Sequence, residues 1–167
     1  MTQGCPQLEN LPANVRKFWE ERQHTLQDTL LRFSYGVLVE STDMMLREKS
    51  GLLYLMQRDL WFEDFQKSSL FSSLFQQGTE YTKTQIQIPR TAIMDVRLVP
   101  AIELGHELLG KRPSSEGFGA FFRLFKPRPN TLLLVRADAA GQPVRCAFRD
   151  IDEPDAWYRA LSAPETL

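Results

Sequence analysis

The sequence is poor in cysteine and histidine, the side chains that most often hold zinc or act as nucleophile and base. It has two of each among 167 residues. Cys5 and Cys146 lie far apart, so they form no disulfide framework, and no second cysteine pair exists for a zinc site. We therefore expect no metal, no cofactor and a reducing compartment.

The sequence also lacks a charge bias. It has 20 basic and 21 acidic residues, for a net charge of −1. A domain that binds nucleic acid is usually strongly basic. Nucleic acid is therefore not an expected partner, and any surface that binds anions must be a local patch.

No apolar run approaches the ~20 residues that a membrane-spanning helix needs. The first ten residues are polar, contain Pro6, and have no apolar core of the kind found in secretory signals. The expected location is the cytoplasm, and any contact with a membrane is expected to be peripheral.

Motifs of catalysis are missing as well. The sequence has no Gly-x-Ser-x-Gly elbow. The stretch from Gly105 to Lys111 matches the first part of a phosphate-binding loop, but Arg112 stands where that motif needs serine or threonine. We expect no enzyme here, and an enzyme of unrecognised type stays open as the alternative.

What the sequence does contain is apolar periodicity suited to one domain, with 11 phenylalanines. After a flexible N-terminus (1–11), residues 12–33 are expected to form an amphipathic helix. Its apolar stripe covers a sheet or, alternatively, mediates self-association. The stripe consists of Val15, Phe18, Trp19, Leu26, Leu30 and Phe33.

Short β-prone segments follow. Lys49-Ser50-Gly51 is typical of a turn, and a hairpin is predicted from Leu52–Met56 and Leu60–Phe65 around Gln57–Asp59. Further strands are expected at 84–88, where Pro89 indicates an edge, at 93–99, at 131–135 and at 143–148. A short helix is expected at 101–110, with Ile102, Leu108 and Leu109 inward, and a closing helix is expected at 155–161.

Three of these segments carry a resemblance. The hairpin from Gly51 to Phe62 resembles the "G-x-L-y-L-t-n-x-x-L-x-F" hairpin of GRAM and pleckstrin-homology-like domains. The segment Ile88–Val96 resembles their "I-P-x-hydroxyl-x-I-x-x-V" strand. Phe148-Arg149-Asp150 leading into Trp157-Tyr158 resembles their last strand and C-terminal helix.

The resemblance implies a mainly β (α+β) fold, a bent antiparallel barrel of about seven strands capped by a C-terminal helix. The domain would span residues 35–162, with an insertion at 101–130 and a tail at 163–167. It also implies a cytoplasmic adaptor that binds phosphoinositides, other anionic lipids or proteins.

The insertion supplies the candidate binding residues, because it interleaves basic and aromatic side chains. Such a mixture suits an anionic membrane surface or a protein interface, and the alternative is that the rings pack on the barrel. A secondary candidate is the pair Phe71 and Phe75. We therefore expect a non-catalytic adaptor that binds a protein partner, with peripheral binding to anionic lipid as the alternative. The candidates in the insertion are Lys111, Arg112, Phe118, Phe121, Phe122, Arg123, Phe125, Lys126 and Arg128.

Overall fold

The computed structural model describes residues 5–42, 45–64, 84–109 and 129–163. Its strands are β1 (Leu30–Thr42), β2 (Met45–Met56), β3 (Asp59–Asp64), β4 (Gln85–Pro89), β5 (Ile93–Val99), β6 (Thr131–Ala137) and β7 (Pro143–Arg149). The helices are η1 (Pro6–Asn10), α1 (Ala13–Leu26), η2 (Arg90–Ala92), η3 (Ala101–Glu103), α3 (Leu104–Leu109) and α5 (Pro154–Ser162).

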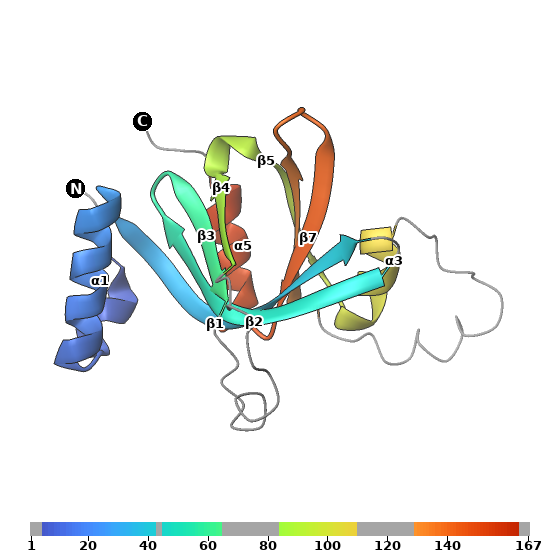
Figure 1. Cartoon of the computed structure of the whole chain (residues 1–167). Helices are drawn as coiled ribbons and strands as arrows, with labels where there is room; N and C mark the ends of the chain where they lie inside the picture. The colour runs from blue at the N-terminus through green and yellow to red at the C-terminus, as the bar shows by residue number, and fades with distance from the viewer. Residues whose placement is uncertain (1–4, 43–44, 65–83, 110–128, 164–167) are drawn as a thin grey trace, which may run out of the picture.

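The seven strands form one antiparallel sheet in the order β4-β3-β2-β1-β7-β6-β5 (Figure 1). Two meanders, β1–β4 and β5–β7, are joined by the pairing of β1 with β7. This confirms the mainly β fold class with seven strands and is consistent with a pleckstrin-homology-like fold. The expected barrel is not closed, because β4 and β5 stand at the two edges of the sheet.

The main core lies on the inner face of this bent sheet, under α5. Trp157 and Leu161 of α5 pack there against apolar side chains from β1, β2, β3, β6 and β7. The C-terminal helix is therefore confirmed as the cover of this face (Figure 1). Its N-cap is Glu153, which makes no capping side-chain hydrogen bond.

The outer face of the sheet has two covers. Near the N-terminus, Cys5 and Trp19 pack with Tyr54 and Met56 of β2. At the other end, Leu104 and Leu108 of α3 pack on side chains from β1, β5, β6 and β7. Figure 1 shows α1 and α3 at opposite ends of the molecule. Both faces of the sheet are thus partly covered, which explains how 167 residues bury so many apolar side chains.

Polar contacts join α1 to β3 beside this cluster. Arg22 forms an ion pair with Glu63, whose side chain is only 5% exposed, and its guanidinium lies 5.6 Å from the centre of the Tyr54 ring. The Tyr54 hydroxyl donates a hydrogen bond to Glu63. Burial, followed by the Glu63 carboxylate, raises the pKa of Tyr54 above its usual value of 10.0.

The predicted helix at 12–33 is wrong in its second half, because α1 ends at Leu26 and β1 begins at Leu30. Gln27 adopts a left-handed conformation that ends the helix. A bulge between Leu30 and Arg32 then places Leu30 and Phe33 in the same outer cluster. This spacing of three mimics a helical repeat.

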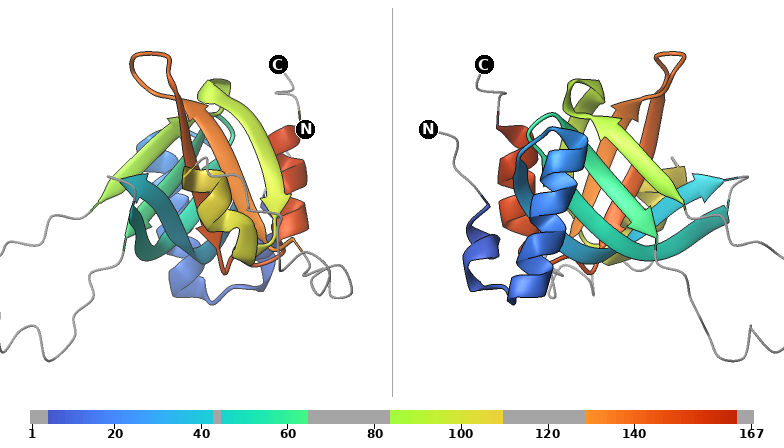
Figure 2. Two further views of the ribbon diagram at one scale, coloured as in Figure 1. Left: turned by 90° about the vertical axis from the view of Figure 1, so that its right-hand side faces the viewer. Right: turned by 60° about the vertical axis from the view of Figure 1, so that its left-hand side comes forward.

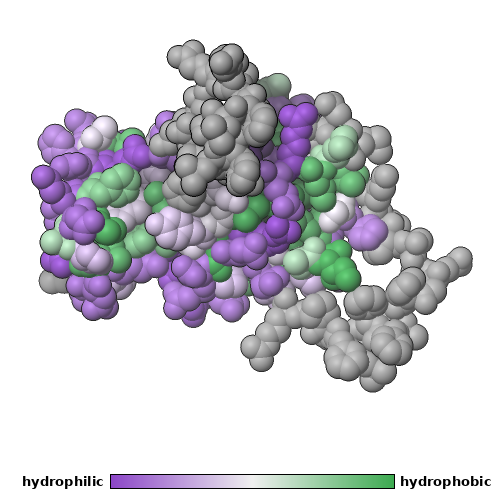
Figure 3. All heavy atoms as spheres, turned by 60° about the horizontal axis from the view of Figure 1, so that its bottom comes forward, coloured by the Kyte–Doolittle hydropathy of each residue, from purple (hydrophilic) through white to green (hydrophobic). Residues whose placement is uncertain are grey.

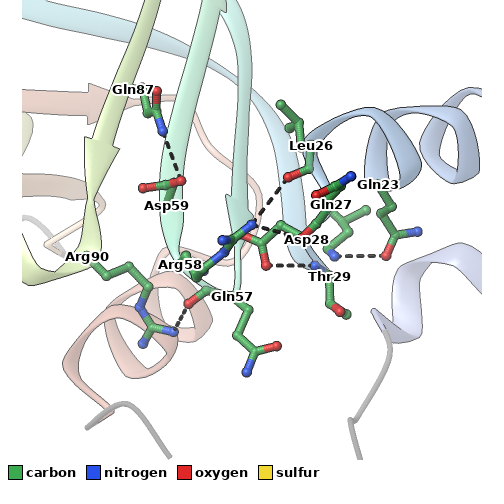
Figure 4. A network of polar contacts seen from close by, with 11 residues as sticks. Gln23, Leu26, Gln27, Asp28, Thr29, Gln57, Arg58, Asp59, Gln87 and Arg90 are labelled. Carbon is green, nitrogen blue, oxygen red and sulfur yellow. Dashed lines mark hydrogen bonds and ion pairs between the residues drawn. The ribbon is translucent and has the colours of Figure 1, made fainter. Parts of the chain in front are cut away.

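A polar network at the end of α1 fixes its position on the sheet (Figure 4). The Arg58 guanidinium, in the turn between β2 and β3, donates to the carbonyls of Leu26 and Gln27 at 3.3 and 2.8 Å. The Arg58 backbone N–H donates to Asp28 at 3.0 Å. These bonds satisfy carbonyls that a helix end leaves without partners.

Other boundaries also differ from expectation. Residues 6–10, predicted to be flexible, form η1, and Gln7 exchanges hydrogen bonds of 3.0 and 3.1 Å with the Phe33 backbone. The predicted turn at Lys49–Gly51 lies inside β2. Ile102, predicted to face inward, is 58% exposed, whereas Leu108 is buried as expected.

None of the described helices is long and apolar enough to cross a membrane.

Candidate functional site

A shallow groove lies between β5 and α5. Its lining residues are Arg97, Leu98 and Val99 of β5 and Tyr158 of α5. Figure 2 (left) shows the two elements side by side at one edge of the sheet. Within the described ranges, β5 pairs with β6 alone, so its other edge faces the groove.

The groove has an apolar floor and a charged rim. Leu98 packs against the main core, and Val99 is 7% exposed. Tyr158 leaves 39% of its surface exposed on the helix side. The Arg97 guanidinium forms ion pairs with Asp95 at 2.8 Å and Glu107 at 3.6 Å. The same strand carries Met94, 61% exposed, on its first half.

This arrangement suits an extended peptide. An edge strand presents backbone N–H and C=O groups that can pair with another strand. Adding a strand there supplies hydrogen bonds, and pockets for alternate side chains supply selectivity. Tyrosine and arginine, the two side chains most exposed in the groove, are enriched in protein interfaces.

No pattern in the sequence predicted the groove between β5 and α5. The strand itself was expected at 93–99, but which strands stand at the edges depends on the pairing order of the whole sheet. Pro89 correctly predicted that the strand at 84–88 stands at an edge, because β4 is an edge strand of the sheet. No comparable pattern identifies β5 as an edge strand, because its partner strand β6 is separated from it by residues 100–130 of the sequence.

The sequence-predicted binding residues cannot be placed beside the groove. Residues 111–128, which hold all nine candidates of the insertion, lie outside the described residues. So do Phe71 and Phe75. The structure does describe the first part of the insertion, in which α3 ends at Leu109 and its Leu104 and Leu108 pack with Val99 of the groove.

The buried thiols are poorly suited to nucleophilic chemistry. Cys146 is 2% exposed, and burial raises its pKa from 9.0 to about 12. Burial also raises the pKa of Cys5. Because the thiolate is the reactive form, both cysteines are packing residues. Among the described residues, no cluster of three or more histidine, cysteine or acidic side chains is placed to hold a metal ion.

Comparisons with known proteins identify no family for this chain. No protein family model matches the chain, and no curated protein is similar to it by sequence. One similar solved structure is the C-terminal domain of an unknown protein from Leishmania infantum. It has 15% identity and a TM-score of 0.47, and the match covers 89% of this chain and 94% of that one.

A second similar structure is a complex of the PDZ-RhoGEF DH/PH domains with activated RhoA. The identity is 12% and the TM-score 0.44, and the match covers 92% of this chain but only 34% of that one. Neither likeness adds to what the strand order shows, and the resemblance to GRAM domains stays a prediction.

Proposed function

We propose that this chain is a non-catalytic adaptor domain that binds a protein partner. The partner presents an extended segment that lies in the groove between β5 and α5. The observation that carries this proposal is the edge of β5, which borders an apolar groove lined by Leu98, Val99 and Tyr158. The two elements that form the walls are held by the main core, so the groove exists before binding.

Preorganised walls matter for affinity, because a segment that becomes ordered on binding loses conformational entropy. Because β5 is already paired with β6, only the partner has to become ordered. Backbone pairing alone would accept many sequences. The Tyr158 ring and the Arg97 rim are the groups that would distinguish among them, the ring by packing and the guanidinium by charge.

Site-specific photocrosslinking tests the proposal. A photoreactive phenylalanine analogue replaces Tyr158, and a matched control carries it at Tyr35, which is 68% exposed on β1. In the native lysate we expect a discrete crosslinked protein from position 158 and none of that mass from position 35. Equal crosslinking from both positions, or none from position 158, would contradict the groove as the binding site.

Peripheral lipid binding through the insertion stays the alternative prediction. Its decisive result would be co-sedimentation with anionic vesicles that weakens as salt rises, and that the pair Arg123→Glu and Lys126→Glu abolishes. That result, together with no crosslink at position 158, would replace the proposed function.

A further inference from the structure

The groove between β5 and α5 also fits a strand of this chain itself. We propose that, in the absence of another partner, the groove is occupied by β5 of a second copy, so that two β5 strands pair antiparallel about a two-fold axis. As a form of regulation this inference rests on the proposed function, because a copy that occupies the groove excludes the other protein from it.

Pairing about a two-fold axis restricts which residues of an edge strand face each other. The axis crosses one residue, which lies opposite its own copy, and residues at equal distances on its two sides face one another. The edge of a strand is a template for such pairing, and opposite charges across it are favourable. A strand therefore fits its own copy where its charges have opposite signs at equal distances from one central residue.

Val96 is such a central residue in β5. With the axis at Val96, Asp95 of each copy lies opposite Arg97 of the other. Both charged side chains are accessible, at 49% and 45% exposure. Val96 packs against the main core, so the two valines meet on the face of the sheet that α5 covers. The middle of the joined ladder is thus apolar, with an opposite-charge pair on each side of it.

The ion pairs that Arg97 makes among the described residues do not use all of its donors. Its Nε lies 2.8 Å from Asp95 of the same strand, and one terminal nitrogen lies 3.6 Å from Glu107. A guanidinium has five N–H donors and a carboxylate accepts at both oxygens, so each group can bond a second partner across the axis. The result is a network of charges of alternating sign, which stabilises more than isolated exposed pairs do.

Other positions of the axis along β5 pair less well. An axis at Asp95 or at Arg97 places like charges face to face, which is destabilising. An axis nearer the start of the strand carries the ladder into η2, and one nearer its end carries it into Pro100, which has no backbone N–H. The sequence of β5 therefore selects one register with its own copy.

The same register gives an apolar partner to Met94, the most exposed apolar side chain of β5. A bulge leaves Met94 without a partner residue in β6, and it is 61% exposed. One step beyond Asp95, the register sets Met94 opposite Leu98 of the copy. Because the axis is perpendicular to the sheet, both α5 helices lie on one face, and Tyr158 of each stands beside the strand that enters its groove.

Another exposed apolar surface lacks this complementarity. Figure 3 shows hydrophobic surface on the right-hand side, where α3 and the end of the β1–β2 hairpin lie. In the described part of the chain, β2 has an unpaired edge there from Met45 to Ser50, and its Arg47 already faces Glu40 in the ladder with β1. No axis within this stretch sets opposite charges of the stretch face to face. The edge that fits its own copy is therefore β5.

A register-specific disulfide tests the position of the axis. Val96→Cys places two thiols opposite each other, at a Cα separation of about 4.5 to 5.5 Å, which suits a disulfide. The matched control, Met94→Cys, alters a more exposed position, but its two copies lie about 13 Å apart in this register. Under mild oxidation we expect Val96→Cys to form a covalent dimer about tenfold faster. Equal rates, or faster crosslinking from position 94, would overturn the inference.

An exchange of charges between two variants tests the selectivity. Asp95→Arg alone and Arg97→Asp alone each set like charges opposite each other, so each should self-associate about tenfold more weakly than wild type in sedimentation velocity. An equimolar mixture of the two should sediment as wild type does, because every charge then faces its opposite in the heterodimer. A mixture that stays monomeric, or a wild type that is monomeric at every concentration, would contradict the pairing.

Photocrosslinking from position 158 separates this inference from the proposed function. In purified protein we expect a product of twice the mass of the chain, which Asp95→Arg weakens. A crosslink to another protein in lysate, without a self-crosslink in purified protein, would leave the proposed function standing and overturn the inference. A self-crosslink without any product from another protein would support the inference and remove the proposed function.

Discussion

Gly36 of β1 and Gly51 of β2 lie directly opposite each other in the ladder between these strands. Both strands bend in this region (Figure 1). A Cβ at Gly51 would collide with the carbonyl oxygen of Glu63 and stand 2.6 Å from the Phe62 ring. A Cβ at Gly36 would lie 2.6 Å from the Ile151 side chain. The two glycines therefore allow β3 and the segment before α5 to approach the bend closely.

We expect Gly51→Ala to destabilise the fold by about 2 to 4 kcal/mol, because the clash is with backbone that cannot move aside. Urea unfolding followed by circular dichroism measures the loss. The control is Gly105→Ala in α3, where the added Cβ has only one neighbour, at 3.9 Å. That change should be neutral or slightly stabilising, since alanine favours helix. Equal effects at both positions would refute the steric explanation.

Trp19 is the anchor of α1. It is 2% exposed and its ring lies 4.8 Å from Phe33 and 5.4 Å from Tyr54, measured between ring centroids. Trp19→Ala should cost about 3 to 5 kcal/mol in unfolding free energy, because it leaves a cavity between helix and sheet. Phe18→Ala, next in sequence but 44% exposed, should cost much less. Similar losses would mean that α1 is not held by this contact.

The ion pair of Arg22 with Glu63 should contribute far more to the free energy of unfolding than an exposed ion pair does. Glu63→Gln leaves a guanidinium that is 22% exposed without its buried counterion, and we expect a loss of about 2 to 3 kcal/mol. Glu21→Gln removes the pair with Lys17, in which both side chains are mostly exposed, and should not change stability measurably. Chemical denaturation of the two variants at low salt makes the comparison.

Stability should fall at alkaline pH through Cys146. Its folded pKa of about 12 exceeds the reference value of 9.0, so the unfolded chain loses the thiol proton first. The contribution is complete below pH 9 and is lost as the pH rises from 9 towards 12, at about 1.4 kcal/mol per pH unit.

Cys146→Ala isolates this contribution. The difference in unfolding free energy between wild type and Cys146→Ala should stay constant from pH 7 to 8.5. Above pH 9 the difference should change in favour of Cys146→Ala, because only the wild type loses the contribution of the buried thiol. A difference that does not change up to pH 10.5 would show that the thiol is not buried as the structure has it.

Much of the fold was predictable because its signals are local. The hairpin around Gln57–Asp59 and the closing helix depend on alternation and turn residues within a few positions, and each is present. The helix at 12–33 was overextended because a bulge in β1 spaces Leu30 and Phe33 as a helix would. The turn predicted at Gly51 was wrong because a glycine needed for close strand packing looks the same in sequence as a glycine needed for a turn.

The sequence by itself determined most of the strands and the C-terminal helix, since hydrophobic periodicity is a property of neighbouring residues. The expectation of a binding module came from the resemblance, the missing catalytic motifs and the basic and aromatic insertion. Only the tertiary structure decided which strands stand at the edges, that the sheet stays open, and that α1 is fastened through Trp19 and Glu63. These features depend on pairing between segments far apart in the chain. A strand stands at an edge when a second strand pairs with one of its sides only, and no local sequence pattern indicates this.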